Sequence, residues 1–356
     1  MVMESCYTWK YRTATFSAAR YAAARPSYPA SLFETVLAYH NAQSASGVLL
    51  DIGCGHGLIA RAMSPHFGRV IAIDTSPGMI KQASSSTQDA KMTFHQAGVE
   101  DLSFLAGESI DMIVAGQSAH WFDYDKAWPE LCRGLKPKGS LAFWGYKDNV
   151  LVGHEQANRI IDKFCYADGE VEREFQGMNA YWEQPGRNRL RNLLRDVQPP
   201  QKDWENIRRI VNDVTPGCAE MPHPEKAWMQ KRINLGQLEA YVRTFSAFQG
   251  WRDAHSDIKS RAEGGEGDLA DFMMLRIVDS EPTWNKLGRD WRSAEADTVW
   301  GTFILLDPLG EETVSCSLRK YVCSRWCYVF ASFQLPFIRM LQCHCTLTEI
   351  DLPLAS

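Results

Sequence analysis

The chain has 356 residues, a formal net charge of −5, 45% hydrophobic residues and 23% charged residues. This length is enough for one large α/β domain or two smaller ones, and the composition is ordinary for a globular protein. The negative charge gives no support to a nucleic-acid or anionic-membrane surface. No apolar window of about 18 residues could span a bilayer, and the first residues lack the apolar core of a secretory signal. We therefore expect a cytoplasmic monomer that binds neither nucleic acid nor membrane.

The first part of the chain alternates apolar runs, typical of buried strands, with segments of helical spacing. The predicted elements are, in chain order, a helix (31–41), a strand (47–53), a helix (58–67), a strand (69–74), a helix (76–86), two strands (92–98 and 110–118), and a helix, a Lys-Pro-Lys-Gly turn and a fifth strand within 124–146. Such alternation predicts a parallel sheet with helices on both faces.

The pattern changes after about residue 150. Residues 151–260 read as mainly helical, a further helix is predicted over 267–278, and a final strand over 297–306 could return to the sheet. We interpret the helical part as an insertion that covers the strand ends. The predicted fold class is therefore α/β: a Rossmann-like, doubly wound, mostly parallel sheet with a helical cap insertion.

Three glycines follow the first predicted strand in the segment "LLDIGCGHG" (49–57). In a doubly wound sheet the ligand lies at the carboxyl ends of the strands, so this turn must pass close to it, and glycine allows that approach. Asp74 ends the second strand, where an acid can accept hydrogen bonds from ribose hydroxyls. A nucleoside-containing cofactor is expected, although a tight turn and a capping aspartate are the plain structural alternatives.

The glycine spacing departs from the dinucleotide fingerprint G-x-G-x-x-G. Gly53 and Gly55 fit it, but Leu58 stands at the third position, and Gly57 comes one residue early. A pyrophosphate site is therefore weakened, and a nicotinamide-dependent oxidoreductase is the least favoured enzyme class.

The segment "LLDIGCGHG" resembles motif I of class I S-adenosylmethionine-dependent methyltransferases. "IAIDTSPGMIKQA" (71–83) resembles the ribose-binding segment of the type 11 group, "AGVEDLSF" (97–104) the segment beside the adenine, and "GLKPKGSLAFWGY" (134–146) the turn and strand that follow. The resemblance implies S-adenosyl-L-methionine as the cofactor. It implies the following cofactor-binding residues: Asp51, Gly53, Cys54, Gly55, Gly57, Asp74, Thr75, Met79, Val99, Glu100 and Gln117.

A narrower resemblance extends beyond the cofactor segments. "FSAARYAAARPSYP" (16–29), "SAHWFDYDKAW" (118–128), "LAFWGY" (141–146), "YWEQPGRNRLRNLL" (181–194) and "LEAYVRTFSAFQGW" (238–251) are similar to segments of fungal trans-aconitate 3-methyltransferases and related fungal small-molecule methyltransferases. It implies methyl transfer to a small carboxylate, giving a methyl ester.

A carboxylate acceptor is already ionised at neutral pH, so it needs cationic partners rather than a general base. Arginine suits this task because its planar guanidinium can donate two hydrogen bonds to one carboxylate. Aromatic side chains could surround the sulfonium through cation–π attraction. The candidate substrate residues are Arg20, Tyr21, Arg25, Tyr28, Trp121, Trp144, Tyr181, Trp182, Arg187 and Arg189, for which surface or packing roles are the alternative.

His120 follows the fourth predicted strand, at the carboxyl end where the methyl group should lie. It is the candidate catalytic residue, either accepting a proton or donating a hydrogen bond to the acceptor. A histidine packed beside Trp121 is the structural alternative. An O- or N-methyltransferase of fungal secondary metabolism, and a non-catalytic regulatory partner that binds S-adenosylmethionine, are the alternative functions.

The predicted organisation has five parts. They are an N-terminal helical segment lining the site (1–46), the S-adenosylmethionine-binding core (47–150), a mainly helical substrate cap (151–296), a returning strand (297–306) and a Cys-rich tail (307–356). The tail resembles nothing in the family and is not expected to belong to the fold. The ten cysteines include no paired CxxC motifs at zinc spacing, so we predict no metal site.

Overall fold

A single mixed sheet organises the part of the chain that a computed structural model describes, residues 24–40, 47–172, 175–204, 206–215 and 228–308. The chain divides into two units, residues 1–316 and 317–356, and every described residue belongs to the first. The sheet has the strand order β3-β2-β1-β4-β5-β10-β8, with β9 also paired to β10. The predicted tail lies outside the described residues except for Asp307 and Pro308, which extend the last strand beyond its predicted end.

Five parallel strands form the first part of the sheet: β1 (Val48–Ile52), β2 (Arg69–Asp74), β3 (Met92–Gln96), β4 (Ile110–Gly116) and β5 (Leu135–Leu151). The chain enters at β1, moves outward to β3 and returns to β4 on the other side of β1. The strand order therefore reverses between β1 and β4, which is where a doubly wound sheet opens a crevice. The predicted α/β fold class is confirmed.

Alternate residues of the strands supply two separate cores, as the period of two in a strand requires. Leu49, Val70 and Val114 face one side, where they pack with helices α2 (Ala30–His40), α3 (Leu58–Met63) and α4 (Pro77–Ser85). Leu50, Ile71 and their neighbours face the other side, where they pack with α5 (Tyr124–Gly134). Burial on both faces explains why these strands read as continuous apolar runs in the sequence.

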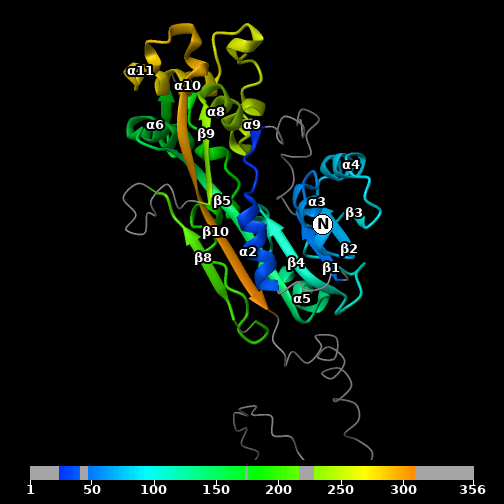
Figure 1. Cartoon of the computed structure of the whole chain (residues 1–356). Helices are drawn as coiled ribbons and strands as arrows, with labels where there is room; N and C mark the ends of the chain where they lie inside the picture. The colour runs from blue at the N-terminus through cyan, green and yellow to red at the C-terminus, as the bar shows by residue number, and fades with distance from the viewer. Residues whose placement is uncertain (1–23, 41–46, 173–174, 205, 216–227, 309–356) are drawn as a thin grey trace, which may run out of the picture. The chain divides into compact units, whose positions relative to one another are not determined.

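The second part of the sheet is antiparallel. β10 (Glu295–Pro308) pairs along β5, and β8 (Arg208–Asn212) and β9 (Met229–Asn234) pair with β10. β5 starts at Leu135, so the predicted Lys-Pro-Lys-Gly turn is an irregular start of the strand, with Lys138 at φ 62°. Figure 1 shows β5 and β10 as long arrows that run from the parallel strands to helices α6, α8 and α10.

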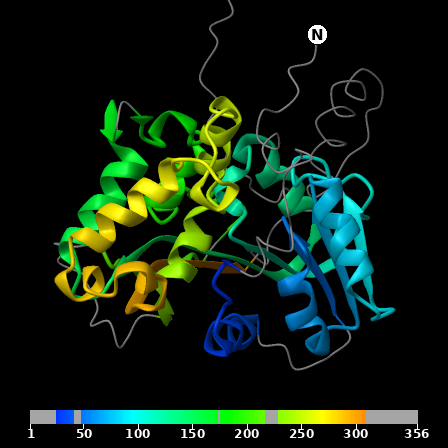
Figure 2. The same cartoon turned by 90° about the horizontal axis from the view of Figure 1, so that it is seen from above.

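Residues 151–296 surround a third core that lies beyond the sheet. Their elements are α6 (Glu155–Tyr166), β6 (Glu170–Glu172), β7 (Phe175–Gln176), α7 (Gly186–Arg191), α8 (Leu235–Val242), α9 (Ser246–Ala254), α10 (Leu269–Asp279) and α11 (Pro282–Asn285), with β8 and β9 between α7 and α8. In Figure 2 the yellow and orange helices gather at one end of β5 and β10, and the blue and cyan α/β part lies at the other. The region is helical as predicted, but it also contributes two strands to the sheet that the sequence did not predict.

Helix α7 ends at Arg191, because Leu193 and Leu194 adopt φ values of 54° and 53°, which no α-helix accommodates. Among the helices of the described residues, none has the length and apolar character needed to cross a membrane.

Candidate active site

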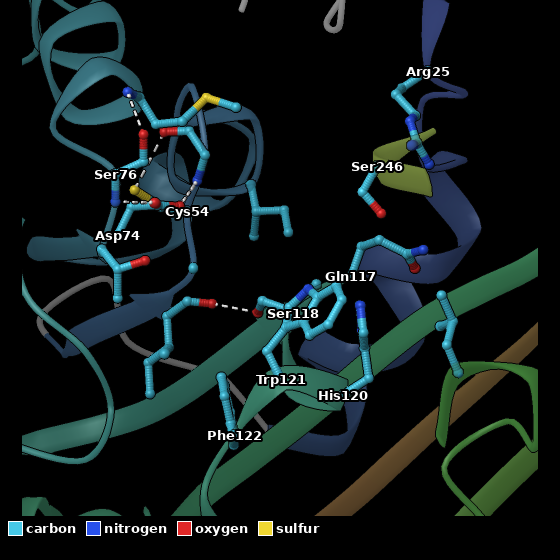
Figure 3. A pocket seen from close by; sticks show the side chains of 18 of the residues that line it. Arg25, Cys54, Asp74, Ser76, Gln117, Ser118, His120, Trp121, Phe122 and Ser246 are labelled. Atoms are coloured by element: carbon cyan, nitrogen blue, oxygen red, sulfur yellow. Dashed lines mark hydrogen bonds between the residues drawn. The ribbon is translucent and has the colours of Figure 1, made fainter. Parts of the chain in front are cut away.

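A pocket of about 270 Å³ opens at the carboxyl ends of β1, β2 and β4, where the strand order reverses. The glycine turn after β1, the end of β2 and the 3-10 turn after β4 form one side. The C-terminal half of β5, α7 and the turn between α8 and α9 form the other. Figure 3 shows Asp74, Ser76 and Cys54 on one side of the pocket and Arg25, Ser246 and His120 on the other.

Most of the predicted cofactor residues line this pocket. They are Gly53, Cys54, Gly55, Asp74, Thr75, Met79, Val99, Glu100 and Gln117. Asp51 and Gly57 do not line it: Asp51 is fully buried beneath the turn, and Gly57 precedes α3 at its N-cap. The sequence segments that predicted a cofactor therefore meet around one cavity. Asp51 and Gly57 lie outside its lining, next to the glycine turn.

The glycine turn is held by a carboxylate and a hydroxyl. Asp74 accepts the Gly55 N–H at 2.9 Å through one oxygen and the Ser76 N–H at 2.8 Å through the other. Burial raises the pKa of Asp74, and these two hydrogen bonds oppose that rise. Ser118 donates its hydroxyl to the Ile52 carbonyl at 2.6 Å. The turn is thus fixed to both β2 and the segment after β4.

Asp51 anchors the helix that follows the turn. Its Oδ2 accepts the Ala60 N–H at 3.0 Å, and its Oδ1 has no hydrogen-bond partner among the described residues. Burial raises the pKa of Asp51 to about 7, the Ala60 hydrogen bond lowers it, and the charge of Asp74 raises it further. A fully buried carboxylate held by one backbone donor positions α3 rather than touching the pocket.

Gln117 joins the ends of β4 and β5. It has φ 57°, its backbone N–H donates to the Trp144 carbonyl at 2.8 Å, and its side-chain amide both donates to and accepts from the Tyr146 backbone at 2.9 Å and 2.8 Å. Both hydrogen bonds of the Gln117 amide are therefore made to the backbone of β5. Although Gln117 lines the pocket, its visible contacts fix the position of the wall that begins at Tyr146.

His120 lies in the 3-10 turn Ala119–Trp121 and is only 4% exposed. Its ring packs on Trp121 at a centroid distance of 4.5 Å, and its Nδ1 has no hydrogen-bond partner among the described residues. Burial lowers the pKa of His120 to about 3, with further lowering by Arg187, Arg25 and Arg189. The imidazole is therefore neutral at physiological pH and weakly basic.

Arg187 enters the pocket from the start of α7. Its guanidinium carbon lies 3.9 Å from the Trp182 ring centroid and 5.2 Å from that of Tyr166, and it forms an ion pair with Asp148. Gly186 places the helix against Trp121, since a Cβ there would lie 2.4 Å from the indole. The packing of α7 on the turn after β4 thus brings Arg187 and His120 into one pocket wall.

Arg25 reaches the same pocket from the segment before α2. Its guanidinium donates to the Thr244 carbonyl at 3.2 Å and lies over the rings of Tyr241 and Phe245, at 5.2 Å and 5.8 Å. Tyr28, also a lining residue, packs edge-on against Trp144 at 5.9 Å. Residues from the N-terminal segment and from the cap therefore complete the wall opposite the glycine turn.

Comparison with known proteins identifies the enzyme class. A methyltransferase-domain family model matches residues 50–143, from β1 into β5. The "Probable S-adenosylmethionine-dependent methyltransferase CRG1" of Saccharomyces cerevisiae is 27% identical over 277 residues, covering 75% of this chain and 89% of the yeast protein. The chain is an S-adenosylmethionine-dependent methyltransferase.

Two further matches support this result, one to part of the sequence and one to the fold. An uncharacterized methyltransferase of Schizosaccharomyces pombe is 30% identical over 154 residues, which cover 43% of this methyltransferase and 60% of the relative. The solved structure of a "Putative Type II Methyltransferase" from Anaeromyxobacter dehalogenans aligns with a TM-score of 0.53 and 22% identity, covering 80% of the methyltransferase and 97% of that chain. The solved structure supports the fold, and the two yeasts show that the relatives include fungal methyltransferases.

Several predicted substrate residues lie away from the pocket of the methyltransferase. Trp144 is fully buried in the core under α2, where it packs on Phe33 at 6.2 Å. Tyr181 packs against His255 at the edge of the cap. Arg189 lies on another face of α7, where it donates to the Phe122 carbonyl at 2.9 Å. These three residues do not line the pocket, whereas Arg25, Tyr28, Trp121, Trp182 and Arg187 do. Arg20 and Tyr21 lie outside the described residues.

The structure adds lining residues that the sequence did not suggest. They are chiefly Ser118, Phe122, Lys147, Asp148, Tyr241, Phe245 and Ser246. The last three belong to the segment "LEAYVRTFSAFQGW", whose similarity to the fungal enzymes was the available signal for them. No signal in the sequence distinguishes Lys147 and Asp148 from other polar residues near a strand end.

The stability of the methyltransferase should carry a pH dependence from His120. Its pKa falls from 6.5 to about 3 on folding, so the unfolded chain binds this proton first as the pH decreases. The contribution of His120 to the free energy of unfolding is constant above pH 6.5. It decreases as the pH falls from 6.5 toward 3. We expect His120→Gln to become progressively more stable relative to wild type over that interval. Urea unfolding of both proteins at about pH 7.5 and about pH 5 measures this, and an unchanged difference would contradict it.

Proposed function

We propose that the methyltransferase transfers the methyl group of S-adenosylmethionine to one carboxylate of a small polycarboxylate similar to trans-aconitate, giving a methyl ester. The observation that carries the proposal is the combination of Arg25, Arg187 and a neutral His120 in one pocket. Two guanidinium groups favour an anionic acceptor. A histidine with a pKa of about 3 is a poor general base, and a carboxylate acceptor needs none.

The side of the pocket formed by the glycine turn fits the nucleoside and amino-acid parts of S-adenosylmethionine. A Cβ at Gly53 would lie 2.4 Å from the Ser118 Cβ, so only glycine lets the backbone occupy this place at the cavity edge. Asp74 and Glu100 offer carboxylate oxygens for ribose hydroxyls, and Met79 and Val99 offer apolar surface for a base. We assign these residues, with the backbone of residues 53–55, to cofactor binding.

The residues of the chain would act by holding and enclosing the acceptor. S-adenosylmethionine, when bound, supplies an electrophilic methyl group whose bond to sulfur breaks as the carboxylate oxygen bonds to its carbon. Arg187 and Arg25 would bind the carboxylates that do not react and so aim the reacting one. His120 would offer a hydrogen bond without moving a proton, since none is released or taken up in this step. Trp121 and Phe122 would exclude water from the reacting atoms.

A transfer assay with the whole chain tests the proposal. Methyl-labelled S-adenosylmethionine is incubated with trans-aconitate, and the labelled product is treated with mild base. A base-labile labelled product is the expected result, because esters hydrolyse under conditions that leave methyl ethers and methylamines intact. Label transfer to phenols or amines but to no carboxylate would contradict the proposed acceptor and leave the enzyme class unchanged.

The remaining sequence predictions stand as part of this proposal. We propose that residues 24–40 and 151–296 form the acceptor side of the site around a cofactor core at 47–150, with residues 297–306 as the returning strand. A role in fungal secondary metabolism, a cytoplasmic location and a monomeric state stay predictions. Size-exclusion chromatography with light scattering tests the last of these.

A further inference from the structure

The charge on the acceptor side of the pocket depends on one acidic side chain. The charged lining residues on this side are Arg25, Lys147, Asp148 and Arg187, so Asp148 is the single carboxylate there among the described residues. The other lining carboxylates, Asp74 and Glu100, belong to the cofactor side, where Glu100 lies beside Gly98 and Asp74 holds the glycine turn. Lys147 is paired with Asp213, which does not line the pocket, at 2.6 Å. Asp148 is therefore the lining carboxylate that offsets the positive charge of the arginines facing an acceptor.

A β-bulge lies where β5 lines the pocket, and it includes Asp148. β5 pairs with β10 through Tyr146 opposite Thr302 and Asn149 opposite Trp300, so two β5 residues, 147 and 148, face a single β10 residue. In a regular strand, neighbouring side chains point to opposite faces, and a bulge breaks that alternation. Tyr146, Lys147 and Asp148, which are consecutive in β5, line the cavity beside this bulge.

Asp148 is engaged on both of its oxygens. One forms the ion pair with Arg187, and the other accepts the Tyr166 hydroxyl at 2.7 Å. Arg187 also stacks on Trp182, and its Nε has no hydrogen-bond partner among the described residues although the side chain is 9% exposed. The Arg187 guanidinium is thus held in place, and its charge is balanced by Asp148. Its Nε–H can still donate a hydrogen bond to an acceptor.

We propose that Asp148 is a specificity-determining residue that limits the number of negative charges the acceptor pocket takes. The inference rests on the proposed anionic acceptor. With Asp148 ionised, the net charge of the Asp148–Arg187 pair is close to zero. An acceptor carboxylate must then share the Arg187 guanidinium with the Asp148 carboxylate. Removal of that anion leaves Arg187 uncompensated and favours an acceptor with one more carboxylate.

The experiment compares two acceptors that differ by one carboxylate, trans-aconitate and trans-glutaconate, in wild type and variants. Asp148→Asn should raise the ratio of kcat/KM for the tricarboxylate over the dicarboxylate by about tenfold, the effect of one charge-assisted hydrogen bond. Tyr166→Phe removes the hydroxyl bonded to Asp148 but keeps the charge, so the ratio should change by less than about threefold. Asp148→Ser, which also removes the charge, replaces Asp148→Asn if the latter does not fold.

The outcomes separate this inference from the proposed function. Wild type that methylates both acceptors, with a ratio unchanged in Asp148→Asn and Asp148→Ser, overturns the role of Asp148 and leaves the function intact. An equal rise in Tyr166→Phe also overturns it, because the effect would then come from side-chain position rather than charge. Wild type that methylates neither acceptor overturns the proposed function, and the inference with it.

Discussion

Replacement of Arg187 by glutamine is expected to lower kcat/KM for a polycarboxylate acceptor by about 100-fold, while the affinity for S-adenosylmethionine stays unchanged. A charge-assisted hydrogen bond contributes about 1.5–3 kcal/mol, and an arginine can make two to one carboxylate. Arg187 and His120 both line the pocket. Cys54 and Asp74, two of the predicted cofactor residues, lie across the cavity from His120 in Figure 3. The loss should therefore fall on acceptor binding and orientation.

Arg191 provides a matched control on the same helix. Its guanidinium lies 3.7 Å from the Tyr166 ring centroid and 3.7 Å from the Asp162 carboxylate, but it does not line the pocket. Arg191→Gln removes a stacked, ion-paired arginine of the same kind and should change kcat/KM by less than about twofold. Arg187→Lys keeps the charge but loses the planar stacking on Trp182, so an intermediate loss of about tenfold is expected.

Steady-state kinetics with trans-aconitate and calorimetry with S-adenosylmethionine measure the two effects separately. Equal, small losses in Arg187→Gln and Arg191→Gln would remove Arg187 from the acceptor site. A weakened cofactor affinity in Arg187→Gln would show that the two sides of the pocket are not independent. Thermal unfolding of Arg187→Gln and of Arg187→Gln/Asp148→Asn distinguishes a binding defect from the cost of an unpaired Asp148.

The cofactor side could be predicted from the sequence because its determinants are local. β2 was predicted at its observed bounds, and the glycine turn after β1 was found because apolar runs, glycines and strand-end acids follow one another in the chain. Parallel strands buried on both faces leave a strong apolar signal. Residues carried by such elements, including Asp74 and Met79, lie around the pocket as expected.

The acceptor side could be predicted only in part, because long-range pairing decides it. β8 and β9 contain mostly polar residues, and β10 brings them into the sheet from far along the chain. The bulge that contains Asp148 exists only in the pairing of β5 with β10. Arg187 and Arg189 looked equivalent in the sequence, yet the direction of a short helix puts one in the pocket and the other behind it.

Replacement of Gly53 by alanine is expected to lower the free energy of unfolding by about 3 kcal/mol or more and to abolish measurable cofactor binding. Two costs add at this position. A side chain at φ 67° costs about 1–2 kcal/mol, and the new Cβ would lie 2.4 Å from the Ser118 Cβ, which forces the turn or Ser118 to move. Displacement of Ser118 also breaks its 2.6 Å hydrogen bond to the Ile52 carbonyl.

Gly55→Ala distinguishes the cost of the backbone conformation from the cost of the steric contact. Gly55 also has a positive φ, 55°, but a Cβ added there would meet no atom within 4 Å among the described residues. Gly55→Ala should therefore lose only about 1–2 kcal/mol, the cost of the backbone conformation. Gly53→Ala/Ser118→Gly should be more stable than the sum of its single variants predicts, because the second change removes the atoms that the first one meets. Urea unfolding measures wild type, the single variants Gly53→Ala, Gly55→Ala and Ser118→Gly, and the double variant. Calorimetry follows S-adenosylmethionine binding. Equal losses in Gly53→Ala and Gly55→Ala, with additive behaviour of the double variant, would show that close packing against Ser118 does not constrain the turn.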